Sequence, residues 1–168
     1  MNKRWIKLFS VRISLLFCTV ILILASIATQ THLSECVTDS LSGIRYLLFM
    51  KNSTPHRGDI VSIQGHAVKY VGTKPLAKRV LGLPADQIVR DKDGVKVKLF
   101  ESQTSNSKPL ALLQATRDGK PLTPLNIQMI PQGYVFVAGD NPNSFDSRYE
   151  EFGLVPMEKI WGKAVFTW

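Results

Sequence analysis

The chain has 168 residues, of which 45% are hydrophobic, and its 21 Lys and Arg against 13 Asp and Glu give a formal net charge of +8. This length and composition predict one folded domain with room for an appendage, and they exclude a disordered or low-complexity chain. Two cysteines exclude a disulfide-dense scaffold and a four-cysteine zinc site. A charge of +8 raises the question of nucleic-acid binding, which depends on where the charges lie.

The positive charge is concentrated at the N-terminus, where Lys3, Arg4, Lys7 and Arg12 all precede the first acidic residue, Glu35. These four residues carry half of the net charge, so the rest of the chain carries the other +4, which is ordinary for its length. No cluster of five or more basic residues occurs anywhere in the sequence. The sequence therefore predicts no nucleic-acid partner.

An uncharged apolar run, residues 13–28, follows the basic start. With its apolar flank and a snorkelling Arg12, the run approaches the roughly 20 residues that a membrane-spanning helix needs. The positive flank predicts a single-pass helix with a cytoplasmic N-terminus. Residues 1–29 then form an anchor, and residues 30–168 lie on the opposite side of the membrane from the cytoplasm. A signal peptide cleaved after Ser26-Ile27-Ala28 stays open as an alternative.

Beyond residue 30, short runs of β-branched, aromatic and aliphatic residues alternate with turn-forming residues, and no long segment has helical periodicity. Turns are predicted at 91–94 and 117–120, and a polar surface loop at 101–109. The expected fold class is therefore mostly β, an antiparallel body on one N-terminal transmembrane helix. The predicted strands are Ile44–Met50, Asp59–Gln64, Val68–Val71, Ala77–Leu83, Gln87–Arg90, Val95–Phe100, Tyr134–Ala138 and Lys163–Trp168.

Several catalytic and cofactor-binding patterns are missing from the sequence. The sequence has only three histidines, His32, His56 and His66, which offer few candidates for a Ser-His-Asp triad or a multi-histidine metal site. No Gly-rich loop of the GxGxxG or GxxxxGK[ST] type occurs, which excludes the common nucleotide-binding classes. No cofactor and no metal are therefore expected.

Lys78 is the candidate for chemistry without histidine. In a strand, alternation places Lys78 and Val80 on one face and Arg79 and Leu81 on the other. An ammonium beside apolar surface loses hydration, so its pKa falls and the neutral amine can take a proton from a serine. A snorkelling lysine with no chemical role is the alternative.

A second candidate segment, Gly139–Arg148, follows the apolar strand that ends at Ala138 and is dense in Asn, Asp and Ser. Such side chains hydrogen-bond to nearby backbone, so an elaborate surface loop would have the same composition. Asp146 and Arg148 are two residues apart and are expected to pair and brace the loop.

Three segments, taken in order, resemble bacterial type I signal peptidases, which are membrane-bound serine–lysine endopeptidases. The resemblance covers most of residues 38–168 and is weakest over 101–130. It implies a signal-peptidase-like β body in the periplasm, anchored in the bacterial inner membrane. The matching segments are Arg57–Val61 (the RGD strand), Lys78–Asp86 (KRVxGLPGD, with Ala85 for Gly) and Gly139–Arg148 (GDNxxxSxDSR), with Phe152–Pro156 resembling the piece that follows.

The resemblance implies that Ser40 attacks the scissile carbonyl to form an acyl-enzyme. Lys78 would be the general base and would later activate the deacylating water. The family places its serine shortly after the membrane segment in a Ser-Met-x-Pro-like context, which corresponds here to Thr38–Gly43. Ser40 fits best although the proline is missing; Ser42 stays open as the alternative, and Ser34 is more remote.

Four further residues receive roles from the resemblance. Ser144 matches the serine that orients the lysine, and Asp146 and Arg148 match residues that hold the loop near the site. Asp140 is a further supporting residue in the same segment. The backbone N–H of Ser40 is expected to donate a hydrogen bond to the oxyanion.

The implied partner is a precursor protein that binds as an extended strand, with small side chains in shallow apolar pockets. Leu41, Ile60 and Val61 are candidates for the pocket lining. The Thr38–Gly43 context and the small size are more similar to the conjugative-transfer (TraF-like) branch, whose members mature pilin precursors and in some cases join the pilin ends. A general type I signal peptidase and a non-catalytic anchored β-domain of a secretion or conjugation apparatus stay open as alternatives.

Overall fold

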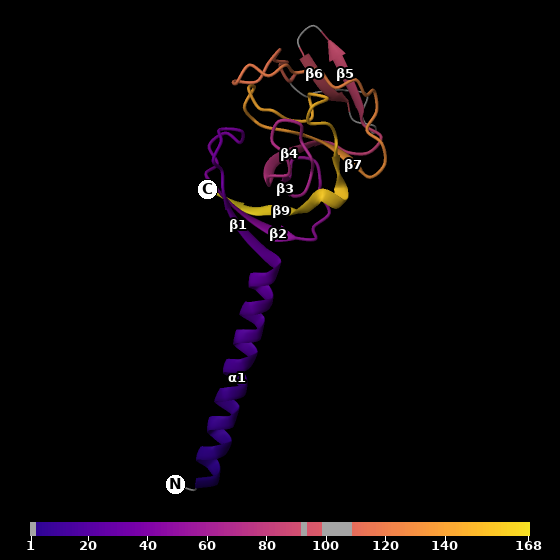
Figure 1. Ribbon diagram of the computed structural model, residues 1–168. Coiled ribbons are helices and arrows are strands. Elements are labelled where there is room, and N and C mark those ends of the chain that lie inside the picture. Colours follow the sequence, from indigo (N-terminus) through magenta and orange to yellow (C-terminus); the bar gives the residue numbers. More distant parts are fainter. Residues whose placement is uncertain (1–2, 92–93, 99–108) are drawn as a thin grey trace. The chain divides into compact units, whose positions relative to one another are not determined.

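The computed structural model describes residues 3–91, 94–98 and 109–168, and it divides the chain into two compact units, Met1–His32 and Leu33–Trp168. The first unit contains the helix α1, Lys3–Gln30 (Figure 1). Its stretch Arg12–Gln30 is long and apolar enough to cross a membrane, as the apolar run predicts.

The second unit is an antiparallel β structure, which confirms the predicted fold class (Figure 1). Seven strands form one sheet in the order β1-β2-β9-β3-β4-β7-β8, and β5 and β6 form a separate hairpin. The elements are β1 Thr31–Glu35, β2 Tyr46–Lys51, β3 Ile60–Ile63, β4 Leu76–Gly82, β5 Gln87–Asp91, β6 Gly94–Lys98, β7 Tyr134–Ala138, β8 Val155–Pro156, the 3₁₀ turn η1 Met157–Lys159 and β9 Ile160–Thr167.

The predicted strand Val68–Val71 is wrong, because this segment is a tight turn. Val68 and Gly72 exchange both backbone hydrogen bonds, at 2.9 and 2.7 Å, and Gly72 has a positive φ of 73°. The apolar side chain of Val68 is buried in the core, so its hydrophobicity reflects packing at the turn and not membership of a strand. The short strands β1 and β8 are elements that the apolar pattern does not predict.

The predicted turns have different outcomes. At 117–120, the Thr116 N–H donates to Lys120 O and the Gly119 N–H to Thr116 O, which confirms a turn there. At 91–94, Asp91 pairs with Gly94 across the β5–β6 hairpin, while 92–93 lie outside the described residues. All of the predicted loop 101–109 except its last residue also lies outside them, as do residues 99–100 of the predicted strand Val95–Phe100.

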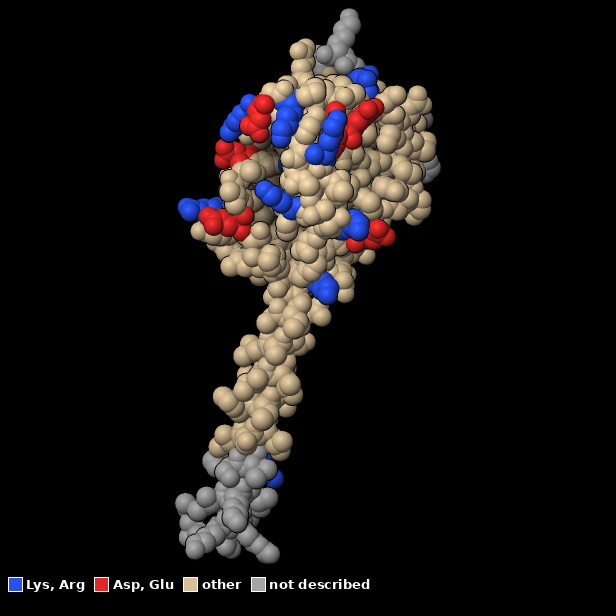
Figure 2. Space-filling view, viewed as in Figure 1, with Lys and Arg blue, Asp and Glu red and all other residues tan. Residues whose placement is uncertain are grey.

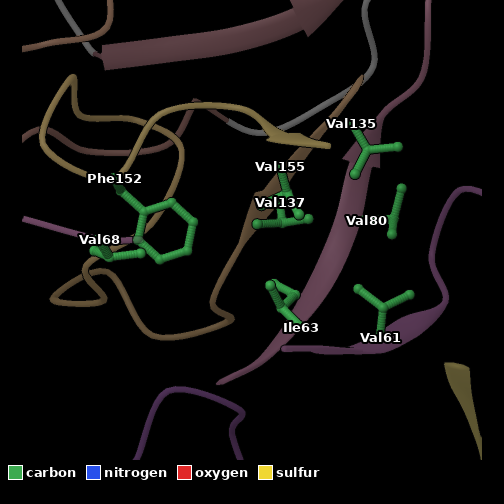
Figure 3. Close-up of a cluster of buried hydrophobic side chains, with 8 residues drawn as sticks. All are labelled: Val61, Ile63, Val68, Val80, Val135, Val137, Phe152 and Val155. Atoms are coloured by element: carbon green, nitrogen blue, oxygen red, sulfur yellow. The ribbon is translucent and has the colours of Figure 1, made fainter. Parts of the chain in front are cut away.

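A layer of buried aliphatic side chains holds the central strands together (Figure 3). Val61 of β3, Val80 of β4 and Val137 of β7 are all fully buried in it. Lys78 precedes Val80 by two residues and therefore lies on the same face of β4, directly opposite Val61 on the neighbouring strand. The sheet register thus carries a lysine into an apolar layer.

Charged side chains of both signs are interspersed on one face of the second unit (Figure 2). On the face shown in Figure 2, the basic groups of this unit lie among acidic ones, and they form no continuous basic stripe. This distribution agrees with the absence of a basic cluster from the sequence.

Candidate active site

Ser40 lies in a loop between β1 and β2. At the base of this loop, the Cys36 N–H donates to Arg45 O at 2.7 Å. Leu41, the residue after Ser40, is only 2% exposed and packs in a cluster with Leu47 and Phe49 of β2 and Ile60 of β3. The buried leucine anchors the loop, so the neighbouring serine has a defined position.

The backbone of Ser40 is also tied to the loop that follows β7. Its carbonyl accepts hydrogen bonds from the N–H groups of Asp140, at 2.8 Å, and Asn141, at 3.3 Å. Gly139 permits this approach, because a Cβ there would stand 2.3 Å from Ser144 Oγ and 2.7 Å from Ser40 O. Glycine is thus the residue that lets the two serine-bearing loops meet.

Three polar atoms from distant segments form a closed triangle. Lys78 Nζ lies 2.5 Å from Ser40 Oγ and 2.6 Å from Ser144 Oγ, and the two hydroxyl oxygens are 3.0 Å apart. Within the part of the chain that the structure describes, no hydrogen bond joins Ser34 or Ser42 to the lysine. Ser40 is therefore the sequence-predicted nucleophile candidate that the fold brings to Lys78.

Burial is the main influence on Lys78, which is 5% exposed. Loss of hydration lowers the pKa of Lys78 from 10.5 to about 8; the Asp146 carboxylate acts in the opposite direction, and the Arg148 guanidinium adds to the lowering. At pH 7 about one lysine in ten is then neutral, compared with about one in three thousand at the ordinary pKa. The amine can therefore act as a base near neutral pH.

A buried ion pair braces the loop, as the sequence predicts. Asp146 and Arg148 are both 0% exposed, and the carboxylate accepts Nε and Nη2 of the guanidinium at 2.8 Å each. The same carboxylate accepts the N–H of Gly139 at 2.9 Å. This pair therefore fixes the backbone at the point where the two serine loops meet.

The remaining donors of Arg148 bind three backbone carbonyls. Nη2 donates to Ser144 O at 2.7 Å, and Nη1 donates to Pro142 O at 2.9 Å and Ala111 O at 2.6 Å. All five guanidinium N–H groups thus have acceptors, so the charge is buried without an unsatisfied donor. The side chain holds the backbone of Ser144 in place.

Asp140 is held by Arg79, a partner that sequence reasoning missed. Arg79 donates Nε and Nη2 to the Asp140 carboxylate at 2.7 and 2.8 Å, and Nη1 to Gly58 O at 3.0 Å. This guanidinium, together with a hydrogen bond from the Ser42 backbone, holds the pKa of Asp140 below its ordinary value of 3.8. The expected placement of Arg79 opposite Lys78 is correct, but only the β4–β7 pairing shows that Asp140 lies within its reach.

The first two motif segments are joined by an ion pair of their own. Arg57 Nη2 donates to Asp86 Oδ2 at 2.6 Å, and the same oxygen accepts the Leu83 N–H at 2.6 Å. Between Leu83 and Asp86, Ala85 has a positive φ of 72°, a conformation that favours glycine. The substitution of Ala for the motif Gly therefore places a side chain on a left-handed turn.

The candidates for the pocket lining and two of the histidines lie among core residues or near hydrogen-bonding and ion-pair partners. Leu41, Ile60 and Val61, the candidates for the pocket lining, are all at most 6% exposed; Leu41 and Ile60 belong to one core cluster and Val61 to another. His66 Nε2 lies 3.0 Å from Phe152 O, and His56 Nδ1 lies 3.5 Å from Asp59. Among the described residues, no group of three or more His, Cys, Asp or Glu side chains is placed to hold a metal ion.

A serine hydroxyl held against a buried amine whose pKa is lowered is the arrangement of serine–lysine hydrolases, in which lysine takes the place of histidine as base. Residues 2–168 match the family described as Signal peptidase, peptidase S26. The chain belongs to that family.

Two curated relatives and one solved structure are similar to this chain. Signal peptidase I of Rickettsia typhi is 27% identical over 143 residues, covering 68% of this chain and 52% of that protein. Thylakoidal processing peptidase 1, chloroplastic, of Arabidopsis thaliana is 33% identical over 100 residues, covering 59% of this chain and 26% of that protein. The crystal structure of a signal peptidase I from Enterococcus faecalis V583 is 24% identical with a TM-score of 0.43, covering 66% of this chain and 97% of that chain. The chain spans about half the length of the rickettsial relative.

Proposed function

We propose that this chain is a membrane-anchored serine endopeptidase of the signal peptidase I type, which removes leader peptides from exported precursors. Residues 30–168 form the peptidase domain in the periplasm, and 1–29 anchor it in the bacterial inner membrane with a cytoplasmic N-terminus. The contact between Ser40 Oγ and Lys78 Nζ, at 2.5 Å, carries the proposal. The basic N-terminal flank supports the orientation.

In the first half of the reaction, neutral Lys78 accepts the proton of the Ser40 hydroxyl as Oγ attacks the scissile carbonyl. The carbonyl oxygen becomes an oxyanion, to which the Ser40 N–H donates a hydrogen bond. The lysine ammonium then gives its proton to the leaving amine, and the acyl-enzyme remains.

In the second half, Lys78 takes a proton from water, whose oxygen attacks the acyl carbonyl. Collapse of the second oxyanion breaks the ester, and the ammonium returns its proton to Ser40 Oγ. Ser144 orients the amine in both halves, because its Oγ accepts a hydrogen bond from Nζ at 2.6 Å. Asp146, Arg148 and Asp140 act as positioning residues through the loops that they hold.

The substrate adds as a strand to the free half of β4. This strand pairs with β3 along Leu76–Arg79, whereas on its other edge the β7 pairing begins only at Arg79, opposite Ala138. Along Leu76–Lys78, that second edge has no strand partner within the described part of the chain. An extended peptide bound there brings its carbonyl groups toward Ser40.

The test is cleavage of a precursor by the full-length chain in detergent, with Ser40→Ala, Lys78→Ala and Ser42→Ala compared. Loss of the nucleophile or base lowers kcat/KM by at least about a thousandfold. The Ser42 variant is the matched control, because it removes an exposed hydroxyl two residues away. Undiminished cleavage by both dyad variants would instead favour a non-catalytic anchored β-domain.

We further propose that the substrate is a pilin-like precursor of a conjugative-transfer system. The Thr38–Gly43 context supports this assignment. Comparison of one pilin precursor with several unrelated secretory precursors tests it. Equal processing of all of them would favour a general type I signal peptidase.

A further inference from the structure

A cavity of about 760 Å³ lies beside Ser40. Its walls are the two limbs of the serine loop, residues 35–39 and 41–45, together with Asn141. Asn141 also donates its backbone N–H to the Ser40 carbonyl at 3.3 Å, so the cavity adjoins the nucleophile. The triangle of Ser40, Lys78 and Ser144 lies outside its lining.

The charges of the cavity wall do not cancel. Glu35 pairs with Arg45 at 3.3 Å, and this guanidinium also lies over the Tyr46 ring. The Asp39 carboxylate is exposed, and among the described residues it has neither a cationic nor a hydrogen-bonding partner. One uncompensated negative charge therefore stands one residue before the nucleophile.

The path of a bound peptide leads toward this cavity. A strand on the free edge of β4 can follow it only as far as Lys78, because from Arg79 onward that edge pairs with β7. The residues after Ala138 then tie to Ser40 through the Asp140 and Asn141 N–H groups. With the acyl side of the substrate on Leu76–Lys78, the chain after the cleaved bond turns away from β4 at Asn141, which lines the cavity.

We propose that Asp39 is a specificity-determining residue that favours substrates with Lys or Arg among the first two residues after the cleaved bond. Their cationic side chains enter the cavity and pair with the Asp39 carboxylate. This inference rests on the proposed peptidase function. Because the pair remains exposed to solvent, the preference over an uncharged residue is modest, about two- to fivefold in kcat/KM, and salt weakens it.

The test uses peptide substrates that are identical except for Lys or Gln at the second position after the cleaved bond. The readout is the Lys/Gln ratio of kcat/KM for the full-length protein, for Asp39→Asn and for Asp118→Asn. The last variant removes the same charge from the exposed 117–120 turn, which does not line the cavity. Any general loss of activity cancels in the ratio.

We expect a ratio of about two to five for the native protein and Asp118→Asn at low salt, falling toward one in about 1 M salt, and a ratio near one for Asp39→Asn at all salt concentrations. An unchanged ratio in Asp39→Asn overturns the inference.

Failure of the proposed function is recognised separately with Ser40→Ala. If this variant cleaves all peptides as well as the native chain does, the peptidase assignment fails and the inference fails with it. If cleavage requires Ser40 but the Lys/Gln ratio is the same in all variants, only the role of Asp39 is overturned.

Discussion

Arg79 and Asp140, 61 residues apart in the chain, meet in a two-point ion pair with contacts of 2.7 and 2.8 Å. The pair stands at the junction between the serine loop and the loop after β7, because the Asp140 N–H also donates to the Ser40 carbonyl. A charge contact on the face opposite Lys78 thus helps to define the position of Ser40.

Loss of this pair should therefore impair activity more than stability. For Arg79→Lys we expect kcat/KM to fall about tenfold, since a point charge cannot reproduce two parallel hydrogen bonds, and unfolding free energy to fall by about 1 kcal/mol. Peptide cleavage and urea unfolding measure the two effects. Arg117→Lys, in an exposed turn, is the control; an equal loss of activity in both variants would contradict the prediction.

The rate should depend on pH through Lys78. The reactive form is the neutral amine, and burial lowers the lysine pKa to about 8, so kcat/KM should rise with pH and level off above an apparent pKa near 8. A pH–rate profile between pH 5.5 and about 10 checks this. If kcat/KM instead rises with an apparent pKa near the ordinary lysine value, the amine is solvated in the working protein.

The buried amine should also cost stability at neutral pH. Its lowered pKa means that, between about pH 8 and 10.5, the unfolded chain binds more protons than the folded one, so this group makes stability rise with pH in that window. Lys78→Met should therefore be more stable than the native chain at pH 7, by about 1–3 kcal/mol. Urea unfolding at several pH values should show the difference shrinking toward pH 10.5, and a pH-independent difference would argue against it.

Gly139 should tolerate no side chain. In Gly139→Ala the new Cβ meets Ser144 Oγ and Ser40 O, so the serine loops must separate. We expect a loss of about 1–3 kcal/mol in unfolding free energy and at least about a hundredfold loss in kcat/KM. Gly119→Ala, on an open turn with a positive φ, should lose some stability but retain activity. Normal cleavage by Gly139→Ala would refute the close-approach argument.

Ala85→Gly should stabilise the protein. Relief of the left-handed strain at φ 72° exceeds the entropy that glycine adds to the unfolded chain, for a net gain of about 0.5–1 kcal/mol with unchanged activity. Ala67→Gly, at an exposed position without positive φ, should lose about the same amount. Thermal unfolding compares the stabilities of the two variants. Equal destabilisation by Ala85→Gly and Ala67→Gly would show that Ala85 is not strained.

Local patterns predicted some elements well and others badly. The strand Tyr134–Ala138 has its predicted bounds, because five consecutive apolar or aromatic residues end at a Gly-Asp turn. Val68–Val71 has similar composition but folds as a turn, because Gly72 reverses the chain and the valine packs inward from there. The polar strand β1 has no apolar pattern of its own and forms a strand by pairing with β2.

The sequence by itself determined the apolar N-terminal helix, the mostly β body, the face on which Lys78 lies and the loop that carries Ser144, because each depends on patterns that are local in the chain. Only the tertiary structure decided that Ser40 contacts Lys78, that Arg79 holds Asp140 and that the lysine is buried deeply enough to lower its pKa. The contacts of the polar triangle join residues 38, 66 and 104 positions apart. They depend on the register of β4 against β3 and β7 and on a glycine that lets two loops meet, which are properties of the packed sheet and not of any one segment.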